Sequence, residues 1–102
     1  MLELRPTCEH CNKALPPASP EARICSFECT FCAGCVERVL HNVCPNCGGG
    51  FVPRPIRPSR PWRGEAYLAK RPPSATVKHK PVDPAVHERF SAAIRDIPPA
   101  DR

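Results

Sequence analysis

Eight cysteines, all between Cys8 and Cys47, are the residues of this 102-residue chain best suited to chemistry. They form four pairs, and three of these have two residues between their members, a spacing that brings two sulfurs to one tetrahedral metal ion. Backbone amides in such a turn also orient the thiolates. Eight thiolates fill two four-coordinate sites, and zinc is the ion that such closed sites favour. The sequence therefore predicts two bound Zn²⁺ ions.

The four pairs can be combined in three ways. Sequential pairing leaves only eight residues between Cys35 and Cys44, and nested pairing confines four ligands to eleven residues. Crossed pairing gives each ion two well-separated pairs, and we prefer it. It predicts one site made of Cys8, Cys11, Cys32 and Cys35 and a second site made of Cys25, Cys29, Cys44 and Cys47.

Other chemistry remains open to the same cysteines. An iron–sulfur cluster would use the four cysteines between positions 25 and 35, and an oxidising compartment would favour disulfides. The chain shows no apolar leader of the secretory type and no stretch long enough to span a membrane. We therefore expect a cytoplasmic protein with reduced thiols and no membrane partner.

Length and composition exclude most enzyme classes. Neither a dinucleotide-binding sheet nor an eight-stranded barrel fits into 102 residues. No nucleophile–base pair is recognisable, and metal sites filled by cysteine leave no open catalytic position. We expect no enzymatic activity and no small-molecule substrate. The cysteine-containing part is also too short for a sufficient apolar core, so we expect it to unfold without metal.

Two local elements would position the cysteines. Apolar residues after the third pair fall at i, i+3, i+4 and i+7, which predicts a two-turn amphipathic helix between the third and fourth pairs. These residues are Val36, Val39, Leu40 and Val43. In the fourth pair, Pro45 fixes φ, and Gly48 can take the left-handed conformation that lets the chain turn back.

The complete ligand order resembles the RING-type cross-brace. Cys29 stands where most RING domains have histidine, Phe31 resembles the aromatic residue before the fifth ligand, and Pro45 resembles the proline between the last two. The resemblance implies a small metal-stabilised domain, RING-like or of the treble-clef type, with a short β-hairpin and one short helix. His10 and Gly48 depart from ligase-type RING domains, so ubiquitin-ligase activity is not implied.

Three segments are similar to a family of small bacterial cysteine-rich proteins, the domain of unknown function numbered twelve-seventy-two. They are residues 1–6 (MLELRP), 20–32 (PEARICSFECTFC) and 44–49 (CPNCGG). The resemblance covers about residues 1–57. It implies a bacterial cytosolic origin and metal binding, and it brings no established activity.

The second half of the chain has a different composition. Ten of fifteen prolines lie from Pro53 onward, and residues 51–80 carry a net charge of +7, within a chain total of +5. Arginines recur there every third residue, which would align them along one edge of a polyproline II helix. Such a ribbon could bind nucleic-acid phosphates, serve as a Pro-rich ligand for a protein, or be a solvated linker. The candidate contact residues are Arg54, Arg57, Arg60, Trp62 and Arg63.

A short amphipathic helix is predicted over residues 83–97. Asp83 is a suitable N-cap, Pro84 suits the first helical position, and Pro98 ends the pattern. A helix of this length is marginal alone, so its apolar face needs a surface on its own domain, a second copy or a partner. The apolar residues are Val86, Phe90, Ala93, Ile94 and Ile97.

These observations predict three regions: a two-zinc domain over 1–52, a flexible Pro/Arg-rich linker over 53–82, and the helix over 83–97. We expect a non-catalytic zinc-binding protein that acts as an adaptor for a protein partner. Nucleic-acid binding through residues 51–80 is the first alternative. A redox sensor, in which thiol oxidation ejects zinc, is the second.

Overall fold

Three short antiparallel strands form the sheet at the centre of the protein. The computed structural model describes all residues 1–102 and places β1 (Ala22–Ile24) between β2 (Thr30–Cys32) and β3 (Val52–Pro53). Ala22 lies opposite Cys32, so the register carries the fifth cysteine into the sheet. The turn between β1 and β2 begins at Cys25 and ends at Cys29. The predicted short β-hairpin is therefore present, whereas β3 was not expected.

A helical segment follows β2 without a linker. α1 (Ala33–Cys35) continues directly into η1 (Val36–Leu40), a stretch of wider π-helical turns. His41 and Asn42 then take left-handed φ values of 53° and 57°, which ends the helix and turns the chain toward Cys44. The predicted helix is thus present, but it starts three residues earlier than Val36 and ends at Leu40.

Cysteines make up most of the main cluster of buried residues. Ten buried residues form one cluster, and six of them are cysteines. The cluster contains Cys8, Leu15, Ala22, Cys25, Cys29, Phe31, Cys32, Cys35, Leu40 and Cys44. The ring of Phe31 meets that of Phe51 edge-on, with centroids 5.5 Å apart. The apolar interior is consequently small, and it surrounds thiols rather than aliphatic side chains.

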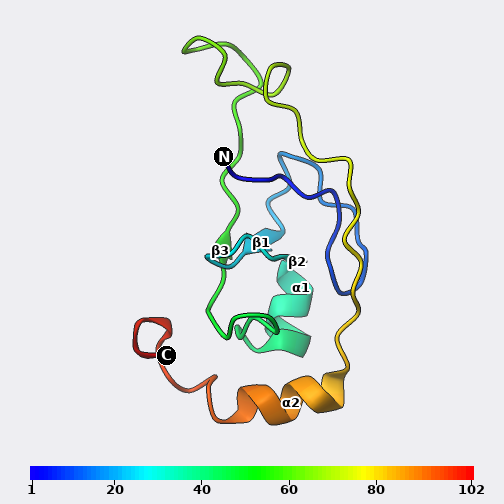
Figure 1. The fold of residues 1–102 in the computed structure, drawn as a ribbon, viewed down its shortest axis with the longest axis vertical. Helices are drawn as coiled ribbons and strands as arrows, with labels where there is room; N and C mark the ends of the chain where they lie inside the picture. The colour runs from blue at the N-terminus through cyan, green and yellow to red at the C-terminus, as the bar shows by residue number, and fades with distance from the viewer.

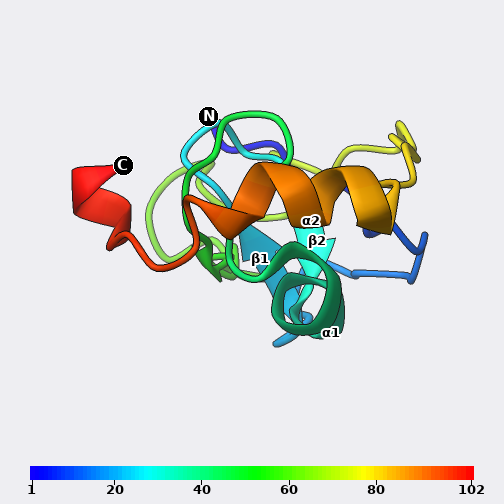
Figure 2. The same cartoon turned by 90° about the horizontal axis from the view of Figure 1, so that it is seen from below.

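The second half of the chain runs along the outside of the first half. After β3 it extends to one pole of the elongated molecule, forms a loop there, and returns to α2 (Pro84–Ala92) at the opposite pole (Figure 1). The molecule measures 46 × 27 × 18 Å. α2 packs against η1, as the view from below shows (Figure 2), and a final turn, η2 (Pro99–Asp101), follows.

α2 is shorter than the predicted helix. The Asp83 carboxylate caps it by accepting hydrogen bonds from the amides of Ala85 (2.9 Å) and Val86 (3.3 Å), as expected. The helix ends at Ala92, where the amides of Ile94 and Arg95 both turn back to the carbonyl of Ser91. Residues 93–97 therefore continue as turns, and the predicted end at 97 is five residues too far.

Backbone hydrogen bonds connect the segment that returns toward α2 with the first half of the chain. The amide of Ser74 donates to the carbonyl of Leu4 (3.0 Å), and that of Lys80 donates to the carbonyl of Glu9 (2.8 Å). Farther on, the His87 ring donates from Nε2 to the Leu40 carbonyl (2.9 Å). The terminal helix thus rests on its own domain. The flexibility predicted for residues 53–82 stays a prediction.

The longest helix, α2, has nine residues, and none of the helices qualifies as a membrane span.

Candidate metal centres

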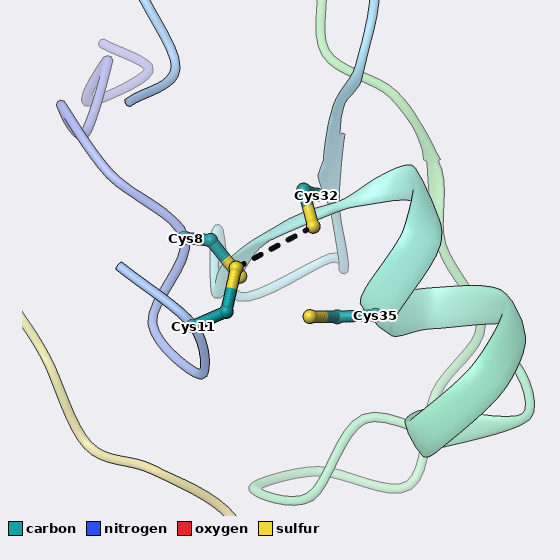
Figure 3. A group of neighbouring side chains, drawn as sticks. All are labelled: Cys8, Cys11, Cys32 and Cys35. Atoms are coloured by element: carbon teal, nitrogen blue, oxygen red, sulfur yellow. Dashed lines mark hydrogen bonds between the residues drawn. The ribbon is translucent and has the colours of Figure 1, made fainter. Parts of the chain in front are cut away.

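Four cysteines from two distant segments converge on one point. The sulfurs of Cys8, Cys11, Cys32 and Cys35 all lie within 4.8 Å of one another. Figure 3 shows the four side chains pointing toward a common centre. The sulfurs of Cys11 and Cys32 are 3.8 Å apart. Three of the four residues are buried and Cys11 is exposed, so the group lies just beneath the surface. We call these residues the first cysteine group.

A tight loop presents Cys8 and Cys11. An isolated bridge between Thr7 and Ala14 closes its base, and the amide of Cys8 donates to the carbonyl of Lys13 (2.9 Å). Asn12 donates back to the Cys8 carbonyl and adopts a φ of 62°, a conformation that asparagine tolerates better than most residues. The loop therefore turns both sulfurs toward the same side.

Glu9 fixes this loop against β2. Its amide donates to the carbonyl of Thr30 (3.0 Å), and its carboxylate accepts in return from the amide of Thr30. The same carboxylate binds the guanidinium of Arg5 at 2.7 Å. Because Thr30 lies two residues before Cys32, this reciprocal pair sets the distance between the two halves of the first group. No sequence pattern had indicated Glu9, since a single acid beside a cysteine has no characteristic spacing.

A second group joins the turn after β1 to the last cysteine pair. The sulfurs of Cys25, Cys44 and Cys47 lie within 4.8 Å of one another. The amide of Cys44 donates to the Gly49 carbonyl, and the amide of Gly48 donates to the Cys44 carbonyl, both at 2.8 Å. Gly48 has a φ of +77°, as the expected turn requires. We call Cys25, Cys44 and Cys47 the second cysteine group.

Cys29 lies at the edge of the second group. It is buried, but its sulfur falls outside the 4.8 Å grouping and accepts a hydrogen bond from the Asn46 side-chain amide at 3.4 Å. The amide of Cys25 donates to the Cys29 carbonyl (3.2 Å), so the backbone of the turn is closed. The structure thus gathers three of the four cysteines predicted for this site and places the fourth beside them.

Burial and crowding raise the pKa of several of the clustered thiols. Burial raises the pKa of Cys35 and of Cys44, and neighbouring cysteines raise both further because adjacent thiolates repel. Burial also raises the pKa of Cys8. At Cys11 burial acts in the same direction, but the Lys13 amide and the neighbouring thiols outweigh it and lower the pKa. A cation at the centre would remove this repulsion, so each group could hold a metal ion.

Arg54 occupies a different place from the one its spacing suggested. It is only 4% exposed, and its guanidinium donates to the carbonyls of Arg5 (2.9 Å), Leu15 (3.1 Å) and Pro16 (3.0 Å). Burial without an acidic partner lowers its pKa. Arg54 therefore holds the end of the first cysteine loop and does not face solvent as a candidate contact. The regular three-residue spacing gave no indication of this.

The other predicted contact residues lie farther along. The Arg57 guanidinium donates to the carbonyls of Leu2 (2.7 Å) and Arg71 (2.6 Å), next to the segment that follows it. Arg60, Trp62 and Arg63 are exposed. The single edge of four guanidinium groups expected from polyproline II geometry is thus divided between structural and exposed arginines.

The chain is similar to known proteins, and the family match covers its first half. Residues 1–57 match the family described as "Protein of unknown function (DUF1272)". An uncharacterized protein of Rhizobium meliloti (strain 1021) is 53% identical over 78 residues, which cover 76% of this chain and 84% of that protein. No solved structure matches. The predicted resemblance is confirmed: the chain belongs to the DUF1272 family.

Proposed function

We propose that each cysteine group holds one structural zinc ion and that the zinc-folded domain serves as a non-catalytic interaction module. The observation that carries the proposal is the convergence of four sulfurs, from loop 8–11 and from the β2–α1 junction, within 4.8 Å. Four soft thiolates around one centre suit tetrahedral zinc and fill its coordination, which leaves no open position for substrate.

The composition of the core supports a stabilising role for the metal. Six of the ten clustered core residues are cysteines, so apolar burial alone offers little to offset the entropy of folding. A structural zinc site contributes about 10–16 kcal/mol of apparent binding free energy. Two such ions would supply most of the stability of this domain.

The proposal includes Cys29 as the fourth ligand of the second ion. Its sulfur lies beside the group and accepts a hydrogen bond from the Asn46 side-chain amide. Burial raises its pKa, and the Asn46 hydrogen bond opposes that rise. A zinc ion would draw the sulfur inward. The two ions would then be ligated by alternating pairs along the chain, which is the RING-like cross-brace.

An interaction role fits the surface better than catalysis does. α2 rests on η1 yet leaves apolar side chains in solvent, with Val86 53% and Phe90 43% exposed. Such side chains beside a rigid domain offer a contact for a protein partner. The proposed setting is the cytoplasm, where the thiols remain reduced.

Native mass spectrometry of the protein purified without added metal tests the proposal. We expect two zinc ions per chain, with both lost on acid denaturation. Cys25→Ser and Cys29→Ser form a matched pair of variants, and each should reduce the zinc content of the protein. Two retained ions in Cys29→Ser alone would remove Cys29 from the site. Iron with sulfide, or a wild-type protein without metal, would contradict the proposal.

One observation also favours the redox alternative. Cys11 is exposed, its pKa is lowered, and its sulfur lies 3.8 Å from that of Cys32. Peroxide would oxidise these two thiolates to a disulfide and be reduced to two molecules of water, which would release the ion from the first group. Zinc release that follows peroxide and reverses with a thiol reductant would support a sensor. Retention of zinc under the same treatment would exclude it.

A further inference from the structure

The loop at the pole opposite α2 is a built structure with an unusual surface. It spans Pro58–Arg71, and we call it the polar loop (Figure 1). The amide of Leu68 donates to the Pro58 carbonyl at 2.9 Å and closes it. Just outside, Arg57 donates to the Arg71 carbonyl (2.6 Å) and to the Leu2 carbonyl (2.7 Å). These bonds fix the base of the loop to the domain.

Trp62 is an exposed aromatic residue of this loop. It is the single tryptophan of the chain, and it is 74% exposed. Its amide donates to the Arg60 carbonyl (3.0 Å), so the turn holds the backbone beneath the indole. Gly64 completes the bend with a φ of +53°, and no atom lies near the position that a Cβ would occupy there. The indole therefore presents a large aromatic face to solvent, where it is free to stack on a flat ligand.

The charges around Trp62 are nearly all positive. The loop contains four Lys/Arg and one acidic residue, Glu65, for a net charge of +3. Glu65 is paired with Arg71 at 3.4 Å, which leaves Arg60, Arg63 and Lys70 exposed and unpaired by any acid. If two zinc ions are bound by eight thiolates, residues 1–50 would carry a net negative charge. The polar loop is therefore suited to a polyanion that also offers flat faces for stacking.

We propose that the polar loop binds single-stranded nucleic acid without sequence preference. One base stacks on the Trp62 indole, and the guanidinium groups of Arg60 and Arg63 contact the adjacent phosphates. Stacking tolerates every base because each has a π-face, whereas a duplex keeps its bases paired and unavailable. An acidic protein would satisfy the charges but would leave the indole without a matching surface, so nucleic acid is the better fit.

Trp62 itself reports the binding. We would titrate the zinc-loaded full chain with an oligothymidylate and follow both the quenching of tryptophan fluorescence and the anisotropy of a labelled strand. Two phosphate contacts predict a slope of about −1.4 in log affinity against log salt, so a fourfold rise in salt should weaken binding about sevenfold. A duplex of equal length should bind more weakly and quench less.

Variants separate stacking from charge. Trp62→Ala should weaken anisotropy-detected binding about tenfold, while Trp62→Phe, which keeps an aromatic face, should largely retain it. Arg60→Ala with Arg63→Ala should weaken binding and reduce the salt slope. Lys78→Ala with Arg89→Ala removes the same charge elsewhere on the surface and should have a much smaller effect. Zinc content provides the check that each variant is folded.

Several results would overturn the proposal. Equal losses in the two double variants would show diffuse charge attraction rather than a site on the loop. Unchanged affinity in Trp62→Ala would remove stacking. Polyglutamate that binds as tightly as the oligothymidylate would identify an acidic protein as the partner class. None of these results bears on the zinc proposal, because metal content is measured separately in every sample.

Discussion

The two halves of the molecule are held by different interactions. In residues 1–57, thiols from distant positions meet in the interior, and the sheet and the helical segment are arranged around them. In residues 58–102 the side chains that become buried are polar, namely His87 and Ser91, and His87 is bonded to a carbonyl of the first half. The first half thus builds its own interior, and the second half depends on it. This dependence predicts that damage to the first half spreads, whereas damage to the second half stays local.

Replacing a cysteine of the first group should have the largest effect. We expect Cys32→Ser to abolish binding of the first zinc and to unfold both halves, because the lost site is worth about 10 kcal/mol or more against a marginal total stability. Amide NMR dispersion and zinc content would measure this. Ser26→Ala, in the exposed hairpin turn, is the control. A folded Cys32→Ser protein with two ions would contradict the comparison.

Acidification should act on the first half in the same way. Burial raises the pKa of Cys35 and Cys44, so these thiols favour the protonated state and zinc must displace their protons. As the pH falls, protons compete more strongly for the thiolates, and the affinity for zinc therefore decreases. We expect zinc release and loss of helical circular dichroism at one common pH. Loss of the second half at a higher pH, with both ions retained, would instead show that its attachment titrates independently.

Within the first half, Arg54 joins the segment after β3 to the first cysteine loop, and its replacement should have an intermediate effect. Arg54→Met keeps much of the volume but leaves the carbonyls of Arg5, Leu15 and Pro16 without their donor. We expect a loss of about 2–4 kcal/mol in the free energy of unfolding, measured by urea denaturation of the zinc-loaded protein. The exposed Arg60→Met is the matched control and should change stability by less than about 0.5 kcal/mol. Equal effects would refute the assigned role of Arg54.

His87→Phe should have the smallest effect of the four. It removes the hydrogen bond to Leu40 and should cost about 1 kcal/mol, confined to the attachment of α2. Hydrogen exchange should accelerate in Pro84–Ala92 while zinc content and exchange in β1 and β2 stay unchanged. Arg89→Ala, at an exposed position of the same helix, is the control. Destabilisation of the sheet by His87→Phe would break the proposed hierarchy between the halves.

The sequence predicted those features that rest on local pattern. Paired cysteines indicated the two groups, the spacing of Val36 to Val43 indicated a helical segment, and Asp83-Pro84 indicated the start of α2. Family membership was also recognisable, because short motifs around the cysteines carry it. Each of these signals lies within a few neighbouring residues, so it survives without knowledge of the fold.

Features that depend on distant contacts were not predictable in the same way. β3 is two residues long, and only its pairing with β1 makes it a strand. In the sequence, Arg54 is one of several regularly spaced arginines. Only the fold shows that its guanidinium donates to three carbonyls within residues 5–16. The reciprocal bonds between Glu9 and Thr30 join positions 21 residues apart. Each of these roles is set by a partner on another segment, which a local pattern cannot indicate.

The alternation of the two cysteine groups along the chain has a consequence for how folding depends on the concentration of free zinc. Cys25 lies between the two pairs of the first group, and Cys32 and Cys35 lie between Cys25 and Cys44 of the second. In the proposed two-zinc state, losing one ion would therefore release a segment that the other ion needs. The ions would enter and leave together, so partial loading would give full and empty molecules rather than half-filled ones. The amount of folded protein would then follow roughly the square of the free zinc concentration, and a modest shortage of metal would remove most of it.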